Sequence, residues 1–403
     1  MYIISDKAKK VSMILMGIGL LTLIYGIVTM LGAEGEDAHH ANSRLWGNIL
    51  INGFFFFSIS LIAVFYIAIQ YAAEAAWSTV FKRVFEATAA YLPIGAGVLV
   101  LVFLVGSLHG HHLYHWMDPE LFDVNSEKYD PVIAGKEPYL NQMFFWARVI
   151  LFIGVCIFFQ RKFRKRSLEE DIVGGVQIHK KNITSAAIFL VFLGFTSSIA
   201  AWDWLMSIDA HWFSTLFGWY TFTGMWISGI TFLTLLIIYL KKQGYLPQVN
   251  RNHIHDMGKW MFAISFLWCY MWFFQYMLIW YSNIPEEVTY YQARLGDYQW
   301  LFFGMFLINF AFPMLILMDR AAKRNYTLLV IVGILIFIGH WLDLYLMVTP
   351  GTMKGHHVNG ILEVGLFLGF LGLFINVVLR ALTKAPLMVK NHPFLEESVH
   401  LQQ

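Results

Sequence analysis

The stretch that decides the fold runs from residue 186 to residue 212, AAIFLVFLGFTSSIAAWDWLMSIDAHW. It begins with about eighteen nearly uninterrupted apolar residues, a length that is sufficient to enter a bilayer. Asp203 then appears between two tryptophans, before the apolar run has ended. A second apolar run repeats this pattern near its end, where GHWLDLY at 339–345 places Asp343 close to a tryptophan. A charged carboxylate at membrane depth costs roughly 2.5–3.5 kcal/mol, so both acids are candidate functional residues.

The composition is that of a membrane protein. Of the 403 residues, 58% are hydrophobic and 13% are charged, whereas about 25% charged residues are usual in soluble chains. Windows of about twenty apolar residues predict an all-α polytopic chain with ten transmembrane helices in a single integral membrane domain, 1–403. The predicted spans are 11–31, 47–71, 87–108, 143–160, 184–206, 213–240, 257–281, 298–318, 327–348 and 360–382.

The connections on the two sides of the membrane differ in charge. Most Lys and Arg side chains fall in the two termini and in every second connection. The other connections hold only Arg44, Lys128, Lys136, Arg294 and Lys354. By the positive-inside rule, this bias predicts that both termini are cytoplasmic. The basic N-terminus resembles a signal peptide, but its long apolar core without an A-x-A site favours a retained first span.

The repeated Trp-near-Asp pattern suggests an internal duplication. The two acids lie in spans five and nine, an even number of spans apart, so a duplicated four-helix unit would keep its orientation. We therefore expect two bundles, at about 47–206 and 213–348, with peripheral helices at about 11–31 and 360–382. Pro93 and Pro313 mark places where a helix is expected to kink.

Five polar residues inside the predicted spans are candidates for a proton path. They are Asp203, His340, Asp343, Glu363 and Arg148. His340 and Asp343 are three residues apart and therefore share one helical face. Carboxylate and imidazole groups take and release protons, and burial moves their affinities towards neutral pH. The alternatives are hydrogen bonds or ion pairs that fix the helices, with Arg148 pairing with an acid, and contact with a substrate.

The outer connections are acidic and rich in His and aromatic residues, which suits a docking surface, although solvated loops are the simpler reading. The run that contains His109, His111, His112 and His115 favours interfacial or partner contacts over a metal site. Only His340 lies deep enough for a membrane haem, so none is expected. Cys156 and Cys269 form no CxxC pair, which argues against an iron–sulfur cluster or a disulfide framework. Aromatic runs such as Phe54–Phe57 suit a quinone cleft or simple packing.

Two segments carry a resemblance to a known family. They are the run from Trp202 to Gly218 and the outer segment SNIPEE at 282–287, and both stand within the ten-span pattern. The chain resembles the NrfD-like (polysulfide-reductase-type) membrane subunits. Among these it is similar to the ActF-type subunits, the second quinone-binding subunits of bacterial alternative complex III.

The resemblance implies a cofactor-free subunit, not catalytic alone, of a quinol:cytochrome c oxidoreductase in the bacterial cytoplasmic membrane. The expected partners are a companion NrfD-like subunit, an iron–sulfur subunit, multihaem or monohaem cytochrome c subunits that hold haem c, a terminal oxidase and lipids, with no nucleic acid. Quinol is the ligand expected to approach this chain. The resemblance implies a proton path near the buried acids and a quinone-site or partner-facing region that includes His109, His111, His112, Asp209 and His211. The rival hypotheses are a stand-alone proton-coupled secondary transporter and a purely structural scaffold.

Overall fold

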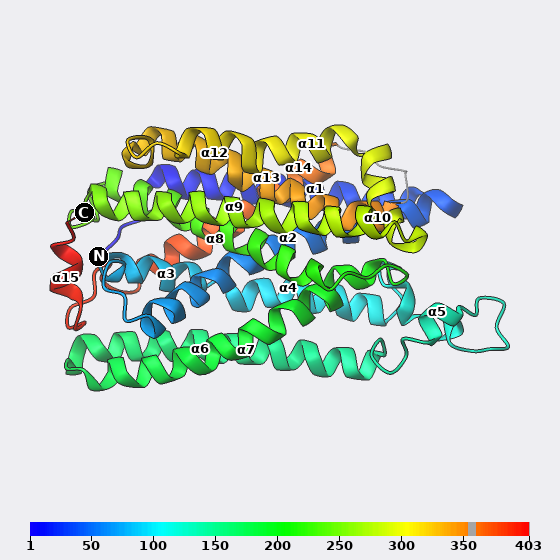
Figure 1. Ribbon diagram of the computed structural model, residues 1–403, viewed down its shortest axis with the longest axis horizontal. Helices are drawn as coiled ribbons and strands as arrows, with labels where there is room; N and C mark the ends of the chain where they lie inside the picture. The colour runs from blue at the N-terminus through cyan, green and yellow to red at the C-terminus, as the bar shows by residue number, and fades with distance from the viewer. Residues whose placement is uncertain (354–359, 403) are drawn as a thin grey trace.

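The protein is a multi-pass membrane protein whose described part contains ten helices long and apolar enough to cross a bilayer. The computed structural model describes residues 1–353 and 360–402, and every regular element in these ranges is helical. The expectation of an all-α fold with ten spans is therefore confirmed. Both chain termini lie at one end of the molecule, here called the inner end, and helix α10 and the 109–141 loop lie at the opposite, outer end (Figure 1).

The ten spans follow the chain in order. They are α1 (Asp6–Gly32), α2 (Gly35–Ala72), η1 (Thr79–Phe81) with α3 (Lys82–Ala89) and α4 (Leu92–Ser107), α6 (Gln142–Val173), α7 (Gln177–Trp204) with η4 (Met206–Ile208), α8 (Leu216–Lys242), α9 (Arg251–Ser282), α11 (Gln299–Phe306) with η5 (Leu307–Ala311) and α12 (Phe312–Leu317), α13 (Tyr326–Met353) and α14 (Ile361–Leu382). The short helices η2 (His115–Met117), η3 (Pro119–Leu121), α5 (Pro131–Ala134), α10 (Pro285–Gly296), η6 (Ala322–Arg324) and α15 (Leu395–Val399) lie outside the spans.

Several helices are longer than the predicted apolar windows. Helix α6 continues to Val173, and α7 begins at Gln177, whereas the windows ended at 160 and began at 184. Helix α2 begins at Gly35 instead of 47. An apolar window reports only the part of a helix that lies in lipid, and charged residues continue the helix into water. The predicted ends were therefore wrong at these places, although each span exists.

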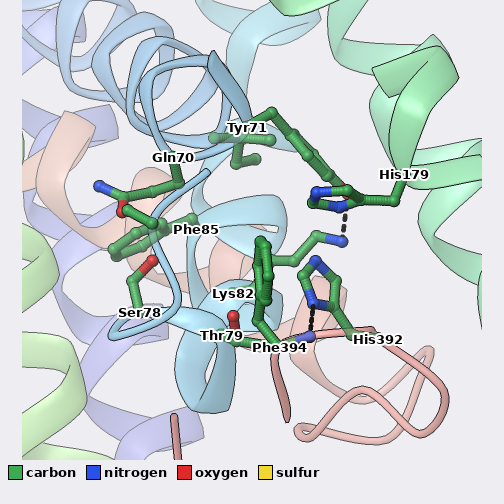
Figure 2. A pocket seen from close by; sticks show the side chains of 11 residues that line it. Gln70, Tyr71, Ser78, Thr79, Lys82, Phe85, His179, His392 and Phe394 are labelled. Atoms are coloured by element: carbon green, nitrogen blue, oxygen red, sulfur yellow. Dashed lines mark hydrogen bonds between the residues drawn. The ribbon is translucent and has the colours of Figure 1, made fainter. Parts of the chain in front are cut away.

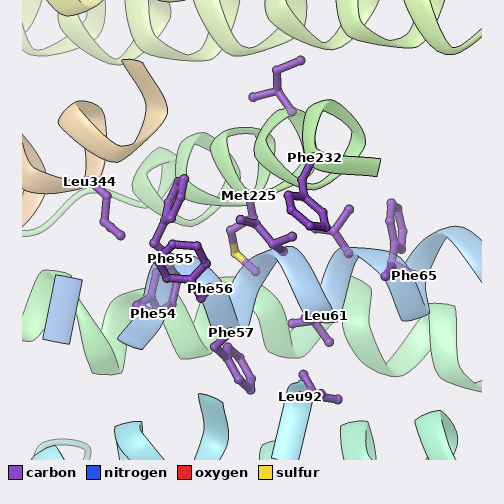
Figure 3. Packing of buried hydrophobic residues seen from close by; sticks show 14 of the residues in the cluster. Phe54, Phe55, Phe56, Phe57, Leu61, Phe65, Leu92, Met225, Phe232 and Leu344 are labelled. Carbon is purple, nitrogen blue, oxygen red and sulfur yellow. The ribbon is translucent and has the colours of Figure 1, made fainter. Parts of the chain in front are cut away.

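Helix α2 is the centre of the molecule. Within its most apolar stretch, 94% of the residues are buried, and it contacts α1, α3, α4, α6, α7, α8, α13 and α14. A helix that is apolar on all faces is expected to be buried in this way. The four aromatic rings of Phe54–Phe57 lie in the buried core (Figure 3). They pack against rings of neighbouring helices, namely Trp204 of α7, Phe337 of α13 and Phe374 of α14. This aromatic run therefore serves helix packing.

The contacts between helices run both within and between the two expected bundles, so this division stays a prediction. Helix α2 contacts α3, α4, α6 and α7, and these five helices are called the first bundle. Helices α8, α9, α11, α12 and α13 are called the second bundle; α2 contacts it through α8 and α13, and α7 contacts it through α8. Helices α1 and α14 pair with each other, and a Cβ at either Gly19 or Gly369 would collide with the backbone of the facing glycine. Small residues allow this close approach. An origin by duplication stays a prediction.

The two intrahelical prolines interrupt their spans by different means. Pro93 occupies the first turn of α4, directly after a break between α3 and α4. Pro313 follows the π-helical turn η5, at residues 307–311. Because proline lacks an N–H group, the helix before it has a free carbonyl, and local widening is one way to adapt.

A third proline, Pro350, lies inside α13 and frees the carbonyl of Leu346. Arg294 of α10 fills this gap, because its Nε donates to the Leu346 carbonyl at 3.0 Å and its Nη2 to the Met347 carbonyl at 3.2 Å. The guanidinium is buried over the ring of Tyr290, 3.2 Å from the ring centroid. Arg294, an arginine at the outer end of the molecule, thus caps the carbonyl that Pro350 leaves without its helical donor.

Arg294→Met is expected to lower the free energy of unfolding by about 2–4 kcal/mol, because two buried carbonyls lose their donor. Thermal unfolding in detergent measures this loss. The exposed Arg251→Met is the matched control. Pro350→Ala restores an N–H group to the helix, so the double variant should lose less than Arg294→Met does alone. Equal losses for Arg294→Met and Arg251→Met would contradict the capping role.

Candidate functional site

Asp203, in the last turn of α7, is held by an arginine. The Asp203 side chain is buried. Arg148 of α6 donates two hydrogen bonds to it, from Nε to Oδ2 at 2.5 Å and from Nη2 to Oδ1 at 3.0 Å. The guanidinium carbon lies 4.1 Å from the ring centroid of Tyr139 and 4.2 Å from that of Phe144. Arg148 therefore pairs with an acid, as one of the alternatives expected, and gives Asp203 a fixed counter-charge.

Glu363, in the first turn of α14, is held in the same manner. Arg44 of α2 donates to both carboxylate oxygens, at 2.7 and 2.8 Å. Asn48 adds a third bond at 3.3 Å, and the backbone N–H of Gly360 a fourth at 2.9 Å. Arg44 falls in a predicted loop, but the longer α2 carries it to α14. Glu363 thus accepts four hydrogen bonds, two of them from the guanidinium that supplies its counter-charge.

Asp343 has a different environment, at the junction of α13, α8 and α9. Its Oδ2 accepts a bond from the indole Nε1 of Trp268 at 2.9 Å, and its Oδ1 accepts one from the hydroxyl of Tyr220. Nδ1 of His340 lies 3.8 Å from Oδ2. Among the described residues, no Lys or Arg forms a hydrogen bond or ion pair with Asp343, which is only 2% exposed. Asp343 is thus a buried acid without a permanent cationic partner.

Two further buried polar groups lie along this part of α13. His340 is 3% exposed, stands edge-on to Trp268, and makes no hydrogen bond to a described residue through either ring nitrogen. Asn309 is fully buried in the π-helical turn, and neither of its amide atoms has a hydrogen-bond partner among the described residues. It packs against α13 at Gly339. Unpartnered buried groups are rare, and π-turns often occur at functional sites. His340 and Asn309 are therefore candidate functional residues of the membrane interior.

The five predicted path residues fall into three separate groups. Asp203 pairs with Arg148, Glu363 pairs with Arg44, and His340 lies beside Asp343. In the described parts of the chain, no direct hydrogen bond or ion pair joins one group to another. Direct contacts between described residues therefore do not link all five, and the relay stays a prediction. His340 with Asp343 is the one of the three groups that contains no arginine.

Three residues near this site, Asn309, Tyr220 and Trp268, were not predicted from the sequence as functional residues. Asn309 is a polar residue in an apolar run, a signal that was present in the sequence. Tyr220 and Trp268 carry no such signal, because both belong to aromatic-rich spans where packing explains them equally well. Gly224 borders the site: a Cβ there would lie 3.6 Å from Asp343 Oδ2 and 3.9 Å from His340 Nδ1, which are ordinary van der Waals distances.

The predicted quinone-site or partner-facing residues gather around one outer cavity of about 430 Å³. Its lining includes His39, His109, His111, His112, His115, Asp118, Lys128, Asp130, Asp209 and His211. His211 Nε2 lies 2.6 Å from Asp130 Oδ2, and His39 stacks on His112. His109, His111, His112, Asp209 and His211 thus lie around one cavity, and their role at a quinone site or partner surface stays a prediction. His356 and His357 lie outside the described residues.

His111 differs from its neighbours because it is buried. Its Nε2 donates to the carbonyl of Val102 at 2.9 Å, and its Nδ1 accepts from the N–H of Leu113 at 3.3 Å. Nε2 therefore ties the loop to α4, and Nδ1 holds the turn of the loop itself at Leu113. The role of His111 at this rim is structural.

The stability of this loop should depend on pH. Burial lowers the pKa of His111 from 6.5 to about 4, and the nearby His112 lowers it slightly further, against the opposing bond to Val102. Between these two values the unfolded chain binds a proton that the folded chain does not, so the free energy of unfolding falls as the pH falls from about 6.5 to about 4. The loss is at most about 3 kcal/mol. His111→Gln should flatten the pH dependence of thermal unfolding, whereas the exposed His112→Gln should not. Identical profiles for both variants would refute this.

Neither a protein-family model nor a curated protein matches this chain. The function proposed below therefore rests on the chemistry of the buried polar groups.

Proposed function

We propose that this chain is a proton-conducting membrane subunit of a quinol-oxidising electron-transfer complex, of the NrfD-like kind that its sequence resembles. The observation that supports this most directly is Asp343, a buried carboxylate that faces a buried imidazole and has no fixed cation. Ion pairs that only hold helices together have the form seen at Asp203 and Glu363. A carboxylate that must change its charge cannot be locked to an arginine in this way.

Proton exchange at this site would use groups that are already in place. The Tyr220 hydroxyl and the Trp268 indole donate to ionised Asp343 and so stabilise its charge without neutralising it. The 3.8 Å gap between Oδ2 and Nδ1 of His340 closes by a small side-chain rotation or through one water. A proton then moves between the carboxylate of Asp343 and the imidazole of His340.

In this proposal, electrons pass through partner chains and not through this one. The companion NrfD-like subunit, the iron–sulfur subunit and the cytochrome c subunits would contact the outer end, at the His- and Asp-lined cavity. Its volume of about 430 Å³ also suits the ring of a quinol. The membrane would be the bacterial cytoplasmic membrane, with both termini in the cytoplasm.

Purification of the tagged protein from its own membranes in a mild detergent tests the proposal. The expected result is co-purification of c-type haem, seen in the visible spectrum, and of an iron–sulfur protein and a second ten-span chain, identified by mass spectrometry. A colourless, solitary protein would overturn it and favour the stand-alone proton-coupled transporter. The helix breaks count against that rival, because they lie in spans three and eight and not at matching places of the two bundles.

A further inference from the structure

We infer that the inner end of the first bundle holds a site for a divalent transition-metal ion such as Zn²⁺, formed by Glu170, His179 and His392. One ligand atom from each lies within 4.8 Å of the other two, and all three side chains are buried. Two imidazoles and one carboxylate make a ligand set that zinc uses in proteins. This inference is independent of the function proposed above.

The three ligands come from three segments that only the fold brings together. Glu170 lies near the end of α6, His179 in the first turn of α7, and His392 in the segment that follows α14. Asp171 fixes that segment: its Oδ1 accepts from the N–H of Lys390 at 3.0 Å, and its carbonyl accepts from the side chain of Asn391 at 2.9 Å. The site lies at the inner end of the molecule, where ions from the aqueous phase arrive without crossing the membrane (Figure 1).

The potential ligand atoms have lone pairs that are available to a metal ion. Within residues 1–353 and 360–402, neither ring nitrogen of His179 has a hydrogen-bond partner, and the same is true of Oε1 of Glu170. The imidazoles of His179 and His392 both point into one pocket (Figure 2). Its free volume is about 20 Å³, which is room for a single water or ion. Buried polar atoms that lack partners are costly, and a bound cation would satisfy them.

Lys82 opposes the metal. Its ammonium lies 3.3 Å from Oε2 of Glu170 and also bonds to the hydroxyl of Tyr71. A divalent ion and this ammonium compete for one carboxylate, so the affinity of the site depends on Lys82. Lys82 lines the pocket between the two imidazoles (Figure 2).

Binding also requires a small closure of the site. Ligand atoms around a tetrahedral zinc ion are about 3.3 Å apart. His392 Nδ1 accepts from the N–H of Phe394 at 3.2 Å, and a metal on Nε2 would place a proton on Nδ1, so this bond is exchanged for the metal bond. Because His392 lies in a non-helical turn, the C-terminal segment is the part that moves. A bound metal would therefore hold the C-terminal segment around His392 against α6 and α7.

The test uses the full-length protein, purified in detergent and freed of metal by a chelator. Co²⁺ is the spectroscopic probe, since tetrahedral Co²⁺ has strong visible bands, and Zn²⁺ displaces it in competition. We expect one equivalent of Co²⁺ with these bands. His179→Ala and His392→Ala should each weaken this equivalent by at least about 100-fold, whereas exposed His400→Ala should not change it. Lys82→Met should tighten it by about tenfold or more.

Two results would overturn the inference. One is the absence of tetrahedral Co²⁺ bands in the wild-type protein, whatever the variants show. The other is binding that His179→Ala and His392→Ala leave unchanged, which would place the metal elsewhere, for example in the outer His-lined cavity. If an alanine variant unfolds, the near-isosteric Glu170→Gln and His179→Gln serve instead, with thermal unfolding as the check on their folding.

Discussion

Asp343→Asn is expected to leave the ten-helix fold intact and to lower proton release coupled to quinol oxidation by at least about tenfold. The amide has nearly the same size as the carboxylate, and its oxygen still accepts from Tyr220 or Trp268. It cannot take up a proton, so the exchange with His340 stops. The measurement is turnover of the purified complex in proteoliposomes, with a pH-sensitive dye inside.

Matched variants separate this role from a structural one. Asp343→Glu keeps a titratable group and should retain part of the coupled activity, and His340→Gln should lower it as Asp343→Asn does. Glu363→Gln removes a carboxylate that is locked to Arg44, so coupling should persist in the molecules that fold. Normal coupled turnover in both Asp343→Asn and His340→Gln would contradict the proton path and favour the scaffold.

Arg148→Met is expected to destabilise the protein by about 3–5 kcal/mol, because it leaves the buried Asp203 without its counter-charge. The loss has a second source, since the Arg148 side chain also packs between Tyr139 and Phe144. Methionine keeps much of that packing, so the lost ion pair dominates. Thermal unfolding in detergent and the yield of folded protein report the effect.

The double variant Arg148→Met with Asp203→Leu is the decisive control. Replacing both charges by apolar groups removes the buried unpaired acid, so much of the stability should return. A double variant as unstable as Arg148→Met alone would show that the effect comes from packing and not from charge. Coupled proton release should be normal in the double variant, because Asp203 lies outside the His340–Asp343 pair.

Asp203 and Asp343 look alike in the sequence, but Asp203 is expected to stabilise the fold and Asp343 to exchange a proton. Each follows an apolar run and stands beside tryptophan, and each lies near the outer end of its span. What distinguishes them is the neighbour that the fold supplies. Helix α6 brings Arg148 to Asp203, whereas α8 and α9 bring only Tyr220 and Trp268 to Asp343.

The sequence by itself determined the ten spans, the all-α class and the common end of the two termini. Each of these depends on local properties, since a run of apolar residues must enter lipid and the connections of one side must gather at one end of the molecule. The limits of the helices were less certain, because a helix continues beyond the lipid that selects its apolar core.

The tertiary structure alone decided which buried groups meet. Glu170, His179 and His392 stand far apart in the chain, and Arg294 caps a carbonyl freed by Pro350 in another helix. Asn309 reaches α13 only because of the π-turn and the packing of the eighth span. Such pairings depend on which helix faces are in contact and on their rotation about their axes. Bilayer insertion selects for hydrophobicity and leaves that rotation open, so side-chain packing between helices fixes it.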